Sequence, residues 1–147
     1  MTPDDLKDTN LDSNEVEDND SLLEDDLPPN CPPPDAEPAN GTVFRCCKNN
    51  PPAASDMLTH VEREQALNAD PCLRRALSVL RSEEDARHQA RLFRGWKTKF
   101  VAKAELTRQH GWCLATPARL PSHTSWWPAK SLNPQARASL FTVTCEV

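Results

Sequence analysis

The chain has 147 residues, enough for one domain, but only 37% of them are hydrophobic and 5% are aromatic, with no tyrosine. This share is low for a packed core of that size. Fourteen prolines against three glycines disfavour β-rich folds and glycine-rich phosphate loops, because both depend on glycine at tight turns. We therefore expect a mainly disordered chain with a small all-α module of two or three helices and no β-sheet.

The net charge of −5 conceals two parts of opposite sign. Residues 1–40 carry thirteen acidic side chains against Lys7 alone, a net charge of −12, whereas residues 41–147 carry a net charge of +7. Such a division indicates self-association, or an acidic tail that tunes a basic binding surface. A tail that only keeps the chain dissolved is the alternative.

Residues 1–27 are predicted to be an acidic disordered tail, because their few apolar side chains cannot offset the backbone entropy lost on ordering. Leu22, Leu23 and Leu27 lie among acidic residues, a pattern typical of short docking motifs that fold on a partner. The tail lacks the apolar core of a signal peptide, and no window of the sequence is apolar enough for a transmembrane segment. We therefore expect an intracellular protein, nuclear or cytoplasmic, whose six cysteines are reduced thiols.

Residues 28–54 contain eight prolines and are predicted to form a proline-rich linker of polyproline II character. The apolar run VFRCC at 43–47 interrupts this linker. Adjacent cysteines make a poor structural disulfide and a poor chelate, so the sequence suggests no role for this run.

Residues 55–110 are predicted to be a helical interaction module, because apolar residues recur there at steps of three and four. Asp70 precedes a proline and fits a helix start, and Ser82 with Asp85 fits a capping box at the start of a further helix. Gly111 fits a left-handed helix C-terminus. Since residues 86, 93 and 100 share one heptad phase, the pattern also favours a coiled coil.

The second half of this module, residues 86–110, carries seven basic side chains against Glu105 alone and is predicted to be a basic amphipathic helix. Such helices bind calmodulin-like proteins, helical grooves, nucleic acid or membrane surfaces, or pack into a larger bundle. We predict that this one binds a protein partner. The candidate partner-binding residues are Leu92, Phe93, Trp96, Phe100, Val101, Arg91, Arg94 and Lys97.

Residues 111–147 show no helical period and are predicted to be an irregular, disordered C-terminal tail. The last ten residues have strand propensity, but no second strand is expected to pair with them. Trp126 and Trp127 would then be exposed, which is an aggregation liability. This pattern favours a segment appended by alternative splicing.

No motif for catalysis, a cofactor or a metal is found in the sequence. His110 and Cys113 have a chelating spacing, but no second pair completes a tetrahedral site. The paired carboxylates lie in the acidic tail, where nothing would fix their geometry. We expect a non-enzymatic adaptor or regulatory protein that binds its partner through residues 86–110. A nucleic-acid or chromatin accessory factor using the same basic face, or a truncated splice isoform of a longer protein, are the alternatives.

Overall fold

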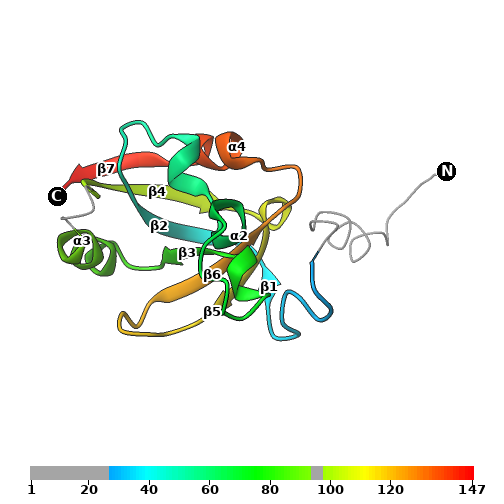
Figure 1. Ribbon diagram of the computed structural model, residues 1–147. Helices are drawn as coiled ribbons and strands as arrows, with labels where there is room; N and C mark the ends of the chain where they lie inside the picture. Colours follow the sequence, from blue (N-terminus) through cyan, green and yellow to red (C-terminus); the bar gives the residue numbers. More distant parts are fainter. Residues whose placement is uncertain (1–26, 94–97) are drawn as a thin grey trace.

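The computed structural model describes residues 27–93 and 98–147. These residues form an antiparallel sheet of seven strands, with short helices in the connections (Figure 1). In chain order the elements are β1 (Glu37–Pro38), β2 (Gly41–Cys47), η1 (Ala54–Met57), α2 (His60–Arg63), η2 (Leu73–Arg75), β3 (Leu77–Leu80), α3 (Glu83–Leu92), β4 (Phe100–Leu106), η4 (Arg108–His110), β5 (Gly111–Ala115), β6 (His123–Pro128), α4 (Pro134–Ser139) and β7 (Thr142–Glu146).

The strands follow one another across the sheet in the order β1-β5-β6-β3-β2-β4-β7. The longest pairing joins β2 to β4 over seven residue pairs, from Gly41↔Leu106 to Cys47↔Phe100. By contrast, β2 and β3 pair only at Phe44↔Leu80. The strands therefore pair over several residues on either side of β2 and β3 but separate between these two strands. The candidate site lies at this separation.

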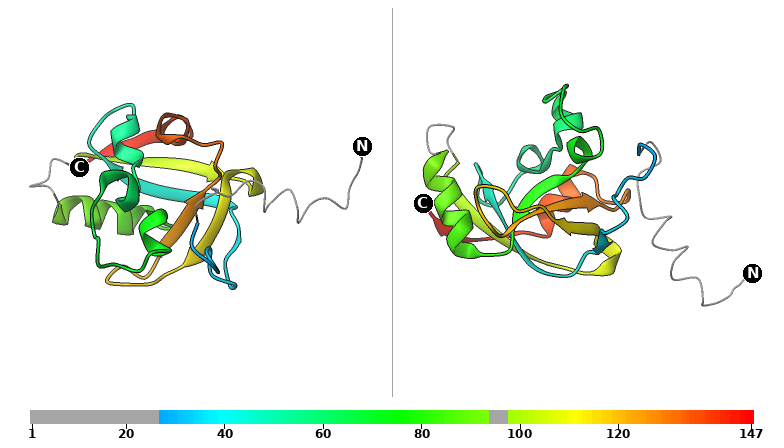
Figure 2. Two further views of the ribbon diagram at one scale, coloured as in Figure 1. Left: turned by 45° about the vertical axis from the view of Figure 1, so that its right-hand side comes forward. Right: turned by 90° about the horizontal axis from the view of Figure 1, so that it is seen from below.

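Helices cover the two faces of the sheet differently (Figure 2). On one face, α3 packs Ala86 and Ala90 against Phe44, Leu80 and Val101. On the other face, η1 and α4 cover the main core. That core contains Val43, Met57, Leu77, Val79, Ala102, Leu106, Trp126 and Phe141.

An ion pair between a buried arginine and a partly exposed glutamate joins α2 to α4 beside this core. The guanidinium of Arg137 is only 1% exposed and donates to both carboxylate oxygens of Glu62, at 2.7 and 3.1 Å. It also donates to the carbonyl oxygens of Met57 and Leu132. Burial opposes ionisation of Glu62, but the hydrogen bonds from Arg137 and Thr59 outweigh it and hold the pKa of this carboxyl below its ordinary value.

The expected fold class, a mainly disordered chain with a small all-α module and no β-sheet, is wrong. The scarcity of glycine does not exclude this sheet, because most successive strands are joined by helical connections rather than by glycine-dependent two-residue turns. Gly111 does follow the last residue of a helix, since it caps the short η4, but it also begins β5 and its backbone is not in the left-handed helical conformation. Its φ is +119°, and a Cβ there would lie 2.0 Å from the carbonyl oxygen of Trp127.

The predicted helix over 86–110 is also wrong, and with it the coiled coil. Ser82 does cap a helix, accepting a hydrogen bond from the amide of Asp85, but α3 ends at Leu92 and β4 begins at Phe100. The sequence FVAKAEL of β4 fits both a step of four and an alternation of two, because its alanines suit either period. This segment forms a strand because it pairs with β2 on one side and with β7 on the other.

Intrinsic disorder is contradicted across the described part of the chain. The proline-rich stretch 28–54 contributes β1 and β2, and the run VFRCC lies in the latter. Residues 111–147 form β5, β6, α4 and β7, with β7 paired to β4. Trp126 and Trp127 are fully buried, so the structural argument for an appended tail loses its basis.

Two cysteines depart from the expectation of six thiols, because Cys31 and Cys72 form a disulfide. This bond ties the start of the described chain to the loop before η2. Cys46, Cys47, Cys113 and Cys145 are free thiols. Among the helices of residues 27–93 and 98–147, none has the length and apolar character needed to cross a membrane.

Candidate functional site

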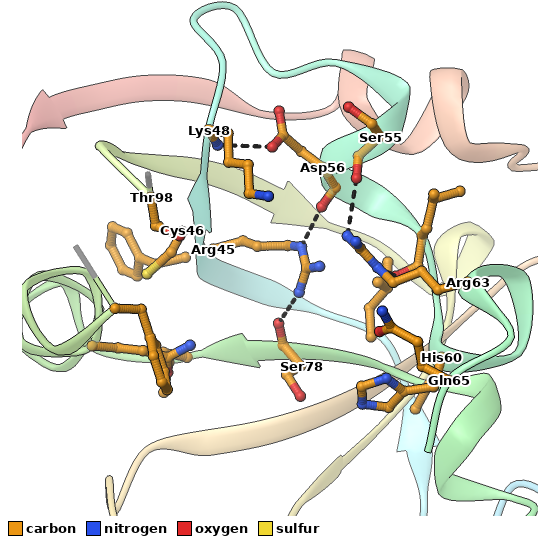
Figure 3. A pocket seen from close by; sticks show the side chains of 17 residues that line it. Arg45, Cys46, Lys48, Ser55, Asp56, His60, Arg63, Gln65, Ser78 and Thr98 are labelled. Atoms are coloured by element: carbon orange, nitrogen blue, oxygen red, sulfur yellow. Dashed lines mark hydrogen bonds between the residues drawn. The ribbon is translucent and has the colours of Figure 1, made fainter. Parts of the chain in front are cut away.

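A cavity of about 300 Å³ opens where β2 and β3 separate (Figure 3). Arg45 of β2 bridges this opening from its centre. Its Nε donates to the carbonyl oxygen of Asp56 at 2.9 Å, and its Nη1 donates to that of Ser78 in β3 at 2.7 Å. The guanidinium thus takes the place of the missing strand pairing and is fixed at the cavity wall. We call this cavity the Arg45 pocket.

A second arginine reaches the same cavity from α2. The hydroxyl of Thr59 caps this short helix by accepting from the amide of Glu62. Arg63 at its end donates through Nε to the carbonyl of Leu58 at 3.3 Å and through Nη2 to that of Ser55 at 3.0 Å. The side chain therefore folds back over η1 and lies near Arg45 (Figure 3).

Asp56, the one acidic residue that lines the Arg45 pocket, is committed to structure. Its buried carboxylate accepts from the amides of Lys48 and Ala53, at 2.8 and 2.9 Å, and from the side chain of Asn49 at 3.0 Å. These three bonds hold the loop that follows β2. Only the backbone carbonyl of Asp56 faces Arg45.

The charge of the Arg45 pocket is therefore strongly positive. Arg45, Lys48 and Arg63 line it, and no carboxylate of the described residues forms an ion pair with any of them. Burial is the main cause that lowers the pKa of Arg45, and the neighbouring charge of Arg63 lowers it further. Both effects disfavour two cations in one cavity, so an anion bound between them would be stabilised.

Apolar side chains also line the pocket. Phe44 and Leu80 come from the junction of β2 and β3, and Phe93 comes from the end of α3. Phe93 is 41% exposed. A ligand that combines negative charge with an apolar group would match both kinds of lining.

The thiol of Cys46 also lines the Arg45 pocket but is not activated. Its Sγ donates to the carbonyl of Ala86 at 3.2 Å, and burial raises its pKa to about 11. Burial likewise raises the pKa of Cys47 to about 12 and that of Cys113 to about 11. At neutral pH these thiols are protonated, which removes the nucleophilic thiolate.

A second cavity of about 330 Å³ adjoins the first and shares His60, Ala76 and Ser78 with it. Arg74 lines this second cavity, and its Nε donates to the carbonyl of Gln65 at 3.1 Å. The two neighbouring cavities are thus each lined by arginine side chains.

His123 lines the second cavity in a fixed orientation. Its Nδ1 lies 3.0 Å from both the carbonyl oxygen and the hydroxyl of Thr116, and that hydroxyl lies 2.9 Å from Ser125 Oγ. Since a carbonyl only accepts, Nδ1 carries the proton and Nε2 of the neutral ring is an acceptor. No carboxylate takes part in this network, which distinguishes it from a catalytic triad.

The predicted partner-binding residues do not lie on one helix. Arg91, Leu92 and Phe93 are exposed at the end of α3, with Leu92 47% exposed. Phe100 is half-buried and Val101 fully buried in β4. Arg94, Trp96 and Lys97, and Leu22 and Leu23 of the docking motif, lie outside the described residues, and Leu27 is half-buried. Among the described members of the set, Phe93 alone lines the Arg45 pocket.

Sequence reasoning missed Arg45, Arg63 and Asp56 as a group. Arg45 lies in the run VFRCC, where a charged residue inside an apolar strand was the available signal. Nothing local indicates that Asp56 and Ser78 would meet it, because those contacts depend on the opening between β2 and β3.

Within the described ranges, no group of three or more His, Cys, Asp or Glu side chains is arranged to hold a metal ion. Comparison with protein-family models, curated proteins and solved structures gives no significant match to this chain.

Proposed function

We propose that this protein is a non-enzymatic binding module that holds an acidic segment of a protein partner in the Arg45 pocket. The observation that carries the proposal is the pair Arg45 and Arg63, whose guanidinium groups are fixed by backbone carbonyls only. Carbonyl dipoles orient a guanidinium without neutralising it, so the positive charge is available to a ligand.

A protein partner agrees with the apolar wall formed by Phe44, Leu80 and Phe93. Acidic segments that dock on proteins combine carboxylates or phosphates with a few large apolar side chains. The pocket offers both kinds of contact within one cavity.

A nucleic acid is the second candidate, supported by the same arginines together with Arg74 in the adjoining cavity. The salt dependence of binding distinguishes an acidic protein segment from a nucleic acid. Binding to a phosphate backbone weakens steeply as counterions are released, with a slope of about −0.7 per contacted phosphate for single strands. A pocket that holds one or two carboxylates beside an apolar wall responds much less steeply.

The test is fluorescence anisotropy with a labelled peptide of four glutamates and two leucines, compared with a labelled thymidine oligonucleotide. Replacing Arg63 by Gln should weaken peptide binding about tenfold, since a charge-assisted hydrogen bond contributes about 1.5–3 kcal/mol. The matched control is Arg119→Gln, which removes an exposed positive charge outside the pocket. Equal affinities in the two variants would contradict the proposal, and preference for the oligonucleotide would favour the second candidate.

A further inference from the structure

We propose that the acidic N-terminal segment of this same chain, centred on residues 15–20, binds in the Arg45 pocket and competes there with the partner. This inference rests on the proposed function, because it names the occupant of that site when no partner is present. The segment lies outside the described residues, so the inference is argued from its sequence and from the surface between its attachment point and the pocket.

Charge is the first argument. Residues 1–26 contain eleven acidic side chains against Lys7 alone, a net charge of −10, whereas residues 27–147 have a net charge of +5. The Arg45 pocket concentrates part of that positive charge, since Arg45, Lys48 and Arg63 line it without a carboxylate partner in the described chain. Opposite charges on one chain attract most strongly where the cations lack partners.

The composition of the segment is the second argument. Residues 15–20 read Glu-Val-Glu-Asp-Asn-Asp, with four acidic side chains around Val16. Such a peptide matches a cavity that is lined by cations together with Phe44, Leu80 and Phe93. Acidic and apolar contacts are then both made within a few residues.

The third argument is the route from the attachment point to the pocket. The described chain begins at Leu27, and Pro28 and Pro29 line a hollow together with Leu73 and Thr116. Leu73 and Thr116 also line the second cavity, which in turn shares His60, Ala76 and Ser78 with the Arg45 pocket. Neighbouring hollows therefore lie between the two points, and Arg74 lines the middle one.

The length of the segment is sufficient for this route. A domain of this size has a radius of gyration of about 14 Å, hence a diameter of about 35 Å. Residues 15–20 precede Leu27 by seven to twelve positions, which corresponds to an extended reach of about 23–40 Å. Tethering at this range gives an effective concentration on the order of 1 mM, so even a weak contact competes with a free ligand.

Competition in trans tests the inference. The probe is a labelled synthetic peptide of residues 11–22, added to the full-length chain. In the variant Glu15→Gln/Glu17→Gln/Asp18→Asn the tethered competitor is weakened, so the probe should bind about tenfold more tightly than to the unaltered chain. The matched control is Glu84→Gln/Glu105→Gln/Glu146→Gln, which removes three exposed carboxylates from the folded part. It changes the net charge equally and should leave probe affinity within about twofold.

The outcomes separate this inference from the proposed function. If the probe binds the unaltered chain and the tail variant equally, and Arg63→Gln still weakens binding, the pocket keeps its function but the tail is not its occupant. If both triple variants tighten binding equally, only net charge matters and the inference fails. Carbodiimide coupling of Lys48 to Glu15, Glu17 or Asp18 within one chain would support the inference. Coupling only between two copies would contradict it.

Discussion

Two groups of arginines in this molecule are both held by backbone carbonyls but are left in opposite electrostatic states. Arg137 is buried, and two carbonyls and both oxygens of Glu62 surround its guanidinium. Arg45 and Arg63 are also held by carbonyls, but no carboxylate of the described residues pairs with them. The difference between a structural arginine and one that can bind a ligand is therefore the presence of a carboxylate partner, and not how firmly carbonyls hold the side chain.

Removing the charge of Glu62 should have the largest effect, because the buried guanidinium of Arg137 then loses the carboxylate that it contacts. We expect Glu62→Gln to lower the free energy of unfolding by about 3 kcal/mol, the lower end of the cost of removing one partner of a buried ion pair, since the Glu62 side chain itself is 29% exposed. The backbone amide of Thr59 donates a hydrogen bond to Oε1 of Glu62 at 2.8 Å. The side-chain oxygen of Gln can still accept this bond. Urea unfolding followed by circular dichroism measures the change, and a loss below about 1 kcal/mol would contradict the account.

The next effect concerns the bridge made by Arg45. Replacing it by Gln leaves the carbonyls of Asp56 and Ser78 without their donor, which we expect to cost about 1–3 kcal/mol. Arg45→Lys should recover part of the peptide binding but little of this stability, since one ammonium group does not reproduce the fixed fork of a guanidinium. Denaturation of the two variants, combined with the anisotropy assay, checks both statements. Full stability in Arg45→Gln would show that the bridge is dispensable.

Acid should weaken the ion pair between Glu62 and Arg137. The pKa of Glu62 is held below its ordinary value, so the stability that it contributes is complete above the ordinary glutamate pKa. That contribution is lost as the pH falls through this value toward the folded-state pKa. Burial also lowers the pKa of His110, which adds a loss of stability as the pH falls through the ordinary histidine range.

Urea midpoints measured between pH 7 and pH 3.5 test this pH dependence. The unaltered chain should lose stability across the whole range, and Glu62→Gln should be less sensitive in the acidic part. Parallel curves for the two proteins would mean that Glu62 is not responsible for the acid sensitivity.

The smallest effect on stability is expected for Arg63→Gln. Arg63 is exposed and bonds only to the carbonyls of Leu58 and Ser55, so its loss should cost less than about 1 kcal/mol. Its effect on peptide binding should nevertheless be about tenfold. A stability loss as large as that of Glu62→Gln would show that Arg63 has a structural role like that of Arg137 and would contradict the distinction between the two groups.

Local signals in the sequence located helix starts better than they located strands. The capping pattern at Ser82 marks the start of α3, and the amides of Cys72 and Leu73 bond to Asp70 at the turn before η2. The two central strands were missed for different reasons. VFRCC carries no alternation of polar and buried residues, because its strand has a neighbour on each side and buried residues on both faces. FVAKAEL does alternate from Ala102 to Leu106, but its alanines also fit a helical step, so the alternation was read as a helix.

The candidate site was less accessible to prediction than the fold. Along the chain, Arg45 precedes Asp56 by 11 residues and Ser78 by 33 residues. Their meeting depends on the single residue pair that joins β2 to β3. The excess of basic residues after residue 40 indicated a cationic surface, but it was assigned to a helix over 86–110 that does not form.

The most direct test follows the arginine side chains themselves during binding. In a ¹⁵N-labelled sample, the Nε–Hε signals of Arg45, Arg63 and Arg137 are assigned by substitution and followed while the glutamate–leucine peptide is added. The account predicts that the signals of Arg45 and Arg63 shift in a saturable manner, whereas that of Arg137, enclosed by Glu62, Met57 and Leu132, stays in place. Saturable binding that leaves Arg45 and Arg63 unshifted would contradict it.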